Sequence, residues 1–159
     1  MIERLDRMEN LVRDIADDLT LGCKVYYNIE TRQCFGALQE TIIDYVDYID
    51  IKDDEFEKVL QEEMSHGMID FVRDLRKGIW LGNHIEPPTS YEKFQWMEDF
   101  VDECSNFSRF VSQAHKALSS RHPFGAFKDA VYSHGMQKSW YAFESERMRD
   151  YVRHELNLA

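Results

Sequence analysis

Residues 87–100 read Pro-Pro-Thr-Ser-Tyr-Glu-Lys-Phe-Gln-Trp-Met-Glu-Asp-Phe, and they carry the clearest helix signal of the chain. The four residues directly after the prolines, Thr-Ser-Tyr-Glu at 89–92, match a capping box, the pattern that starts a helix. Phe94, Met97 and Phe100 then recur every third residue, which places them on one face of that helix. The stretch therefore predicts a capped amphipathic helix whose apolar face packs against other parts of the chain.

Three further helical patterns follow towards the C-terminus. Apolar residues recur at helical spacing over residues 107–118, 123–131 and 140–152. Gly135 separates the last two patterns. Two pairs of rings have the i, i+3 spacing that is typical of a core face: Phe124 with Phe127, and Trp140 with Phe143.

Residues 2–19 predict another amphipathic helix. Its apolar positions are Ile2, Leu5, Met8, Val12, Ile15 and Leu19. From Leu5 onwards they are spaced alternately by three and four residues, which is also the spacing of a coiled-coil seam. The repeat is short for a coiled coil that is stable alone. We expect the stripe to pack on the protein's own core, and pairing with a second copy is the alternative.

A short β-hairpin is predicted after this helix. Gly22 fits the helix end, and residues 24–29 and 33–38 are rich in β-prone side chains. The three residues between the two runs have the length of a hairpin loop. Residues 41–50 fit a strand or a helix, and residues 53–78 predict a helix with an acidic start.

The composition suits a single domain over residues 1–159. A chain of this length can bury a real core. Seven glycines and three prolines are few for a many-turned β fold. We therefore expect a predominantly α-helical α+β fold, with a helical core and one small N-terminal β-hairpin.

The chain is acidic, and its charge is unevenly distributed. Residues 1–104 hold 11 Lys and Arg against 25 Asp and Glu, a balance of −14, whereas residues 105–159 hold 8 against 5, a balance of +3. Three cysteines without a CxxC pair favour neither a disulfide scaffold nor a structural zinc site. Because the N-terminus is charged and no apolar run is long enough for a membrane span, we expect a reduced cytoplasmic protein without a membrane partner.

Residues 87–156 contain three aromatic motifs: Phe-Gln-Trp-Met-Glu-Asp-Phe at 94–100, Pro-Phe-Gly-Ala-Phe-Lys-Asp at 123–129 and Trp-Tyr-Ala-Phe-Glu-Ser-Glu-Arg at 140–147. Together these motifs resemble an uncharacterised bacterial protein family with a provisional UPF name. The tyrosine-rich residues 25–32 also resemble an extended segment of this family, in which Arg32 replaces a glycine after Glu-Thr. The resemblance implies a mostly helical α+β fold and no known activity.

The sequence contains no recognisable reaction centre. Phosphate-binding glycine loops, the GxSxG elbow, HExxH and the zinc-deaminase signature are absent. Glu63 and His66 form an ExxH, which places two metal ligands on one helical face, but no second ExxH completes a di-metal site. We therefore predict no catalytic residue, no cofactor and no metal site, and we interpret Glu63 and His66 as part of a polar helix face.

Basic and aromatic side chains in the C-terminal half form a candidate binding set. They are Trp96, Lys128, Lys138, Trp140, Arg147, Arg149 and Arg153. Such residues stack on bases and contact phosphates in nucleic-acid-binding proteins. The core spacing of the rings and the pI of about 4.9 favour a structural role instead. Arg147 lies one helical turn past Phe143, where it can stack on an aromatic ring or pair with a buried acid.

The leading hypothesis from the sequence is a non-enzymatic helical domain that acts through a protein partner or self-association, for instance as a homodimer. It rests on the heptad-like helix at residues 2–19, the charge asymmetry and the missing catalytic motifs. Nucleic-acid association through the basic C-terminal third is the alternative. A metal-dependent enzyme that uses Glu63 and His66 is the third hypothesis.

Overall fold

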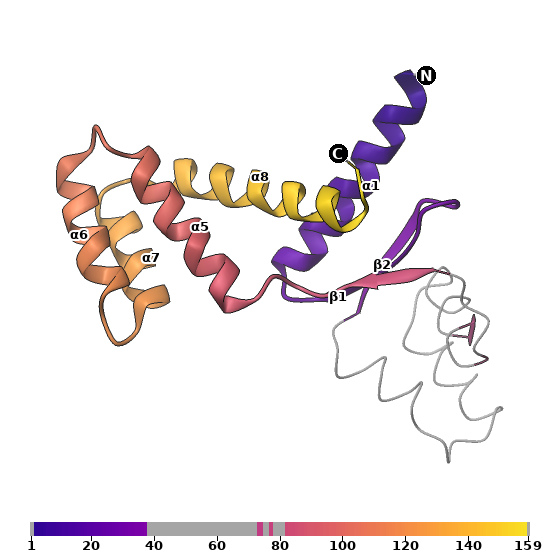
Figure 1. The fold of residues 1–159 in the computed structure, drawn as a ribbon, viewed down its shortest axis with the longest axis horizontal. Coiled ribbons are helices and arrows are strands. Elements are labelled where there is room, and N and C mark those ends of the chain that lie inside the picture. The colour runs from indigo at the N-terminus through magenta and orange to yellow at the C-terminus, as the bar shows by residue number, and fades with distance from the viewer. Residues whose placement is uncertain (1, 38–72, 75–76, 78–81, 159) are drawn as a thin grey trace, which may run out of the picture. The chain divides into compact units, whose positions relative to one another are not determined.

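The computed structural model describes residues 2–37, 73–74, 77 and 82–158. The chain divides into two compact units, Met1–Pro87 (the N-terminal unit) and Pro88–Ala159 (the C-terminal unit), which are coloured along the chain in Figure 1. The single domain expected over residues 1–159 stays a prediction. Residues 41–50 and most of the helix predicted at 53–78 lie outside the described residues.

The N-terminal unit begins with helix α1, Ile2–Thr20, as the apolar pattern predicts. The second half of α1 is buried, and its buried residues are Leu11, Val12, Ile15, Ala16 and Leu19. α1 packs against strands β1 and β2 of the sheet, Lys24–Asn28 and Gln33–Ala37. The chain leaves the helix at Gly22, whose φ of +82° is a conformation that glycine adopts without strain.

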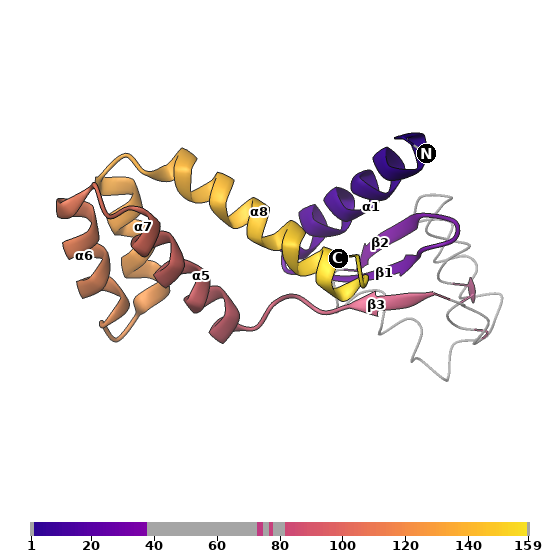
Figure 2. The same ribbon diagram turned by 45° about the horizontal axis from the view of Figure 1, so that its top comes forward.

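Three antiparallel strands form the sheet of this unit, in the order β2-β1-β3 (Figure 2). β1 and β2 are the predicted hairpin, with Tyr26 opposite Phe35. The third strand, β3, is Asn83–Ile85 and pairs Ile85 with Val25. The sequence patterns do not predict β3, which extends the hairpin to a three-stranded sheet.

The hairpin turn holds a non-glycine residue in a left-handed conformation. Arg32 has a φ of +58°. The side-chain oxygen of Asn28 accepts hydrogen bonds from the backbone N–H groups of Glu30 and Thr31, at 2.9 and 3.2 Å. These two bonds hold the start of the turn, so the backbone keeps a conformation suited to glycine although Arg32 occupies the position.

A glycine in β2 allows α1 to approach the sheet closely. A methyl group at Gly36 would lie 2.7 Å from Cγ of Asp18 and 3.0 Å from its Cβ. Burial raises the pKa of Asp18, although the hydrogen bond that its carboxylate accepts from the Gly36 backbone N–H acts in the opposite direction. The contact between helix and strand therefore depends on the absence of a side chain at Gly36.

The described residues of the C-terminal unit contain four helices. They are α5 (Ser90–Glu103), α6 (Ser108–Leu118), α7 (Pro123–Ser133) and α8 (Gln137–Glu155). The predicted capping box starts α5: the Thr89 hydroxyl accepts a hydrogen bond from the Glu92 backbone N–H at 3.2 Å, and Glu92 Oε2 accepts one from the Thr89 backbone N–H at 2.7 Å. Together with the small sheet, these helices confirm the predicted, predominantly helical α+β fold.

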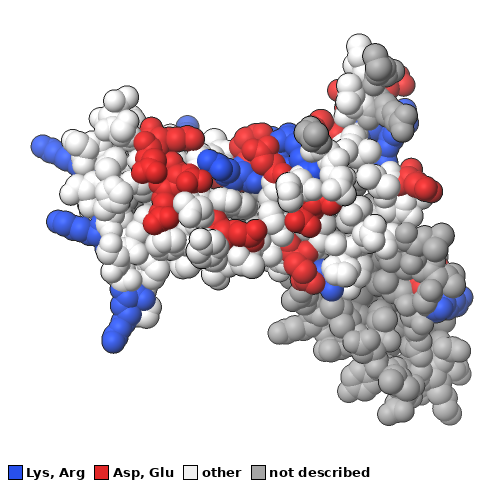
Figure 3. Space-filling view, viewed as in Figure 1, with Lys and Arg blue, Asp and Glu red and all other residues white. Residues whose placement is uncertain are grey.

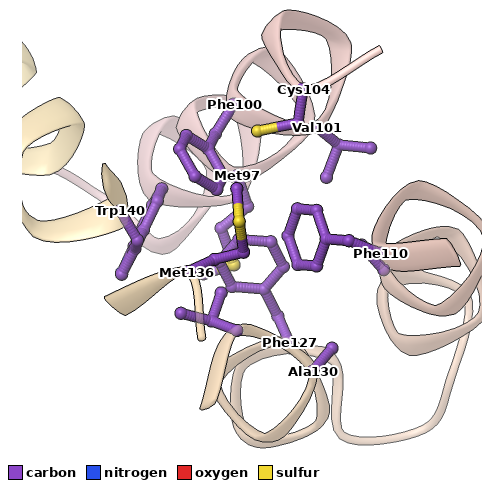
Figure 4. Packing of buried hydrophobic residues seen from close by; sticks show 11 residues of the cluster. Met97, Phe100, Val101, Cys104, Phe110, Phe127, Ala130, Met136 and Trp140 are labelled. Atoms are coloured by element: carbon purple, nitrogen blue, oxygen red, sulfur yellow. The ribbon is translucent and has the colours of Figure 1, made fainter. Parts of the chain in front are cut away.

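Aromatic rings from all four helices meet in the core of this unit (Figure 4). Phe100 of α5 contacts one ring from each other helix, with centroid distances of 5.9 Å to Phe110, 6.4 Å to Phe127 and 5.3 Å to Trp140. Phe127 and Trp140 contact each other at 4.9 Å. Edge-to-face contacts of this kind stabilise a core beyond the apolar area that the rings bury. The prediction that Phe127 and Trp140 are core residues is confirmed.

Replacing Arg32 by glycine should stabilise the protein. Glycine adopts a positive φ without the steric cost that other residues carry, although it also makes the unfolded chain more flexible. We expect the free energy of unfolding to rise by about 1 kcal/mol for Arg32→Gly, measured by urea denaturation. Arg32→Ala is the control because it removes the same side chain but keeps a Cβ. An equal gain for both variants would contradict this explanation of the turn.

Gly36→Ala and Gly125→Ala should change stability in opposite directions. The new methyl group at Gly36 collides with Asp18, so we expect the free energy of unfolding to fall by about 1–3 kcal/mol. A methyl group at Gly125, inside α7, meets no atom within 4 Å, so the helix propensity of alanine should add about 0.5–1 kcal/mol. Thermal unfolding followed by circular dichroism measures both variants. A Gly36→Ala protein as stable as the unmodified one would show that α1 and β2 do not pack this closely.

Candidate functional site

The two tryptophans of the predicted binding set lie in different environments. Trp140 is 3% exposed and belongs to the core, where a ligand cannot reach its ring. Trp96 is half-buried and lines a small cavity of about 250 Å³ together with Arg147. The other residues that line this cavity are Glu92, Asp150, Tyr151, His154 and Glu155. Of these two rings, only that of Trp96 is open to a ligand.

Arg147 already has two partners within the C-terminal unit. Its Nη2 lies 3.4 Å from Oδ2 of Asp99 on α5, and its guanidinium carbon lies 4.9 Å from the centre of the Phe143 ring. The sequence predicts both kinds of partner, although Asp99 is half-buried rather than buried. A partly exposed ion pair of this kind adds little stability, and it leaves little of the arginine's charge for a ligand.

Arg149 and Arg153 are paired with acids of their own helix. Nη1 of Arg149 lies 3.7 Å from a carboxylate oxygen of Glu146. Nη1 of Arg153 lies 3.2 Å from Glu146 and 2.8 Å from Asp150. These contacts balance the charge of α8, so its arginines offer little net positive charge to a phosphate backbone.

Lys128 and Lys138 are exposed on α7 and α8. Neither has a carboxylate within ion-pair distance among the described residues. Burial raises the pKa of Glu144, while the charges of Lys128 and Lys93 act to lower it. The charge of Lys128 is therefore close enough to influence the pKa of the half-buried Glu144, whereas Lys138 faces solvent.

The metal hypothesis concerns residues outside the described ranges. Glu63 and His66 both lie there, so the ExxH stays a hypothesis. Within the described part of the chain, no three His, Cys, Asp or Glu side chains are grouped as a metal site requires. In the same residues, no helix is both long and apolar enough to cross a membrane.

The three cysteines are free thiols in poor positions for nucleophilic chemistry. Burial raises the pKa of the Cys34 thiol to about 12. It also raises the pKa values of Cys23 and Cys104. A thiol attacks as its thiolate, so these raised pKa values lower the reactivity of the three thiols at neutral pH.

The first half of α1 exposes an apolar stripe. Ile2 is 77% exposed, Leu5 is 64% exposed and Met8 is half-buried. Leu5 and Met8 continue the register of Val12 and Ile15, which are completely buried, and Ile2 lies about one helical turn before Leu5. The expected packing on the protein's own core therefore holds for the second half of the helix, and Ile2, Leu5 and Met8 (the α1 stripe) extend beyond it.

Two cations on α6, Arg109 and Lys116, lie outside the binding set predicted from the sequence. Both are exposed, and neither has a carboxylate within ion-pair distance in the parts of the chain that the structure describes. The sequence does contain a sign of this basic surface, because residues 108–118 of α6 include no Asp or Glu. In Figure 3 blue side chains stand out at the α6 end of the C-terminal unit, whereas red side chains gather over α5.

A comparison with protein-family models finds a match for the C-terminal part of the chain. The model described as an uncharacterised protein family, UPF0158, matches residues 81–158, which include α5 to α8 but not the hairpin at 25–32. No curated protein and no solved structure matches the chain. The predicted resemblance to a UPF family is confirmed, since residues 81–158 match the model of the uncharacterised protein family UPF0158.

Proposed function

We propose that this is a non-enzymatic, cytoplasmic bacterial protein that acts through protein–protein contacts, and that the α1 stripe joins two copies of it. The observation that carries the proposal is the exposure of Leu5 in the same register as the buried Val12, with the exposed Ile2 about one helical turn before Leu5. Scattered apolar side chains are common on protein surfaces, but a stripe that continues a core pattern is typical of an interface.

A second copy of α1 fits the stripe by its spacing and its charges. Leu5 and Val12 occupy heptad position a, and Met8 occupies position d. In this register Arg4 lies at g and Glu9 at e. In a parallel pair, position g of one helix faces position e of the following heptad in the other, so Arg4 of each copy faces Glu9 of its partner. Opposite charges would thus meet on both flanks of the stripe.

The size of the stripe sets the expected affinity. Three apolar side chains per copy bury much less than the roughly 800 Å² per partner of a standard stable complex. The exposed part of α1 is also shorter than helices that pair stably without other contacts. We therefore expect a weak dimer whose population rises with protein concentration.

The two other hypotheses have less support. The charges of Arg147, Arg149 and Arg153 are paired with acids, which removes much of the basic surface that nucleic-acid binding through α8 would use. The metal-dependent enzyme rests on Glu63 and His66, which lie outside the described residues. Both rank below self-association.

Leu5→Glu should abolish the dimer. The substitution puts two carboxylates against each other at the centre of the stripe, where burying a charge is strongly unfavourable. Sedimentation equilibrium between about 10 and about 500 µM, a range suited to a weak complex, should give a mass that rises above the monomer for the unmodified protein and a constant monomer mass for the variant. Asn10→Glu adds the same charge at an exposed position off the stripe and should dimerise normally.

Exchange of the flanking charges tests the orientation of the pair. Arg4→Glu and Glu9→Arg each put like charges together in a parallel dimer, so each should weaken it several-fold. The double variant restores opposite charges and should recover the affinity. Circular dichroism checks that every variant is folded. A monomer at all concentrations, or an Asn10→Glu variant as defective as Leu5→Glu, would contradict the proposal.

A further inference from the structure

α6 presents two rows of hydrogen-bond donors on the surface of the C-terminal unit. Ser108, Ser112 and Lys116 are spaced at i, i+4 and i+8, which aligns them along one side of the helix. Arg109 and Gln113 form the neighbouring row with the same spacing. All five side chains are exposed, and none of them is an acid.

A groove runs beside these rows. Two cavities of about 300 and 580 Å³ adjoin each other, since both are lined by Ser108, Arg109 and His134. The larger is completed by Ser112, Gln113 and Lys116, and the smaller by Asn106, Phe107, Phe110 and Met136. The two cavities together are the α6 groove. No Asp or Glu is among the described residues that line it.

His134 forms one wall of the groove, directly after the end of α7. Its Nε2 lies 2.7 Å from Oε1 of Gln113, and its ring meets the ring of Phe110 edge-on at 5.8 Å. The Oε1 oxygen can only accept a hydrogen bond, so Nε2 of His134 donates it. The amide N–H groups of Gln113 then remain available as donors to a ligand.

The two cations of the groove differ from the arginines of α8. Among the described residues, no carboxylate lies within 4.0 Å of the charged group of Arg109 or Lys116, whereas Arg149 and Arg153 have acidic neighbours. Cations at a concave surface attract anions from solution. α6 also begins without a side-chain cap, so the N–H groups of its first turn add partial positive charge at the same end.

We propose that the α6 groove binds a phosphate group. A phosphate has more acceptor oxygens than a carboxylate, which suits a site with a guanidinium, an ammonium, two hydroxyls and an amide. Arg109 supplies a fork of N–H donors, and Lys116 supplies a compact charge two helical turns further along. The ligand is therefore a phosphate ester, either a small molecule or part of a nucleic acid.

This site is independent of the proposed dimer. It lies on α6 and the end of α7 in the C-terminal unit, whereas the α1 stripe belongs to the N-terminal unit. A protein that remains monomeric can still bind phosphate in the groove, and a protein that does not bind phosphate can still dimerise. The experiments on the two sites can therefore fail separately.

Titrations followed by ¹H–¹⁵N NMR test the site with four probes: inorganic phosphate, AMP, adenosine and a mixed-sequence single-stranded oligonucleotide. Sodium chloride holds the ionic strength constant throughout. Phosphate and AMP should give saturable shifts of the backbone amides of residues 107–116 and 134, and adenosine should give none. An oligonucleotide that shifts the same amides and competes with phosphate would support the site with nucleic acid as the source. Binding of AMP but not of the oligonucleotide would support it with a small phosphate ester as the source.

Substitution of the two cations tests the site directly. Arg109→Gln and Lys116→Gln should each weaken phosphate binding about tenfold, because each removes a charge-assisted hydrogen bond. Arg121→Gln removes the same charge from an exposed position that lines neither cavity and should leave the dissociation constant unchanged. Shifts that do not saturate, shifts away from α6, or an effect of Arg121→Gln as large as that of Arg109→Gln would overturn the proposal.

Discussion

The ring of Phe100 holds the C-terminal unit together. It contacts one aromatic ring from each of the other three helices and also the ring of Phe143, at 5.3 Å. Because rings prefer edge-to-face or offset contacts at such distances, one side chain of α5 orients three other helices. α6 is attached to this core through Phe110, whose ring also meets His134. The shape of the α6 groove therefore depends on the same aromatic contacts that stabilise the fold.

The aromatic motifs mainly form the core of the C-terminal unit, so the candidate binding surfaces lie outside them. Trp140 and Phe127 are buried, and Arg147 is held between an acid and a ring, so the aromatic motifs mainly build the helical core of the C-terminal unit. Two surface features do not belong to this aromatic core. The α1 stripe is apolar and suits a protein partner, whereas the α6 groove is cationic and suits an anion. An acidic protein can carry such a groove because residues 105–159 have a balance of +3.

Features that depend on neighbours along the chain could be predicted from the sequence. The capping box at Thr89 and the helix end at Gly22 need only a few adjacent residues, and both are present. Strand β3 could not be predicted, because Asn83–Ile85 has no repeated apolar pattern and becomes a strand by pairing with β1. The α6 groove could not be predicted either, since Arg109 and His134 line it together only in the folded unit. The lack of acids in α6 was the one local sign of it.

Self-association through the α1 stripe is tested most directly by hydrogen–deuterium exchange at two protein concentrations. At a concentration that populates the dimer, the backbone amides of residues 2–9 should exchange more slowly than at high dilution, because pairing slows the fraying of this end of the helix. Residues 12–19, whose apolar side chains are already buried, should exchange at the same rate at both concentrations. Equal exchange of residues 2–9 at the two concentrations would contradict the proposal, since the stripe would then remain in water.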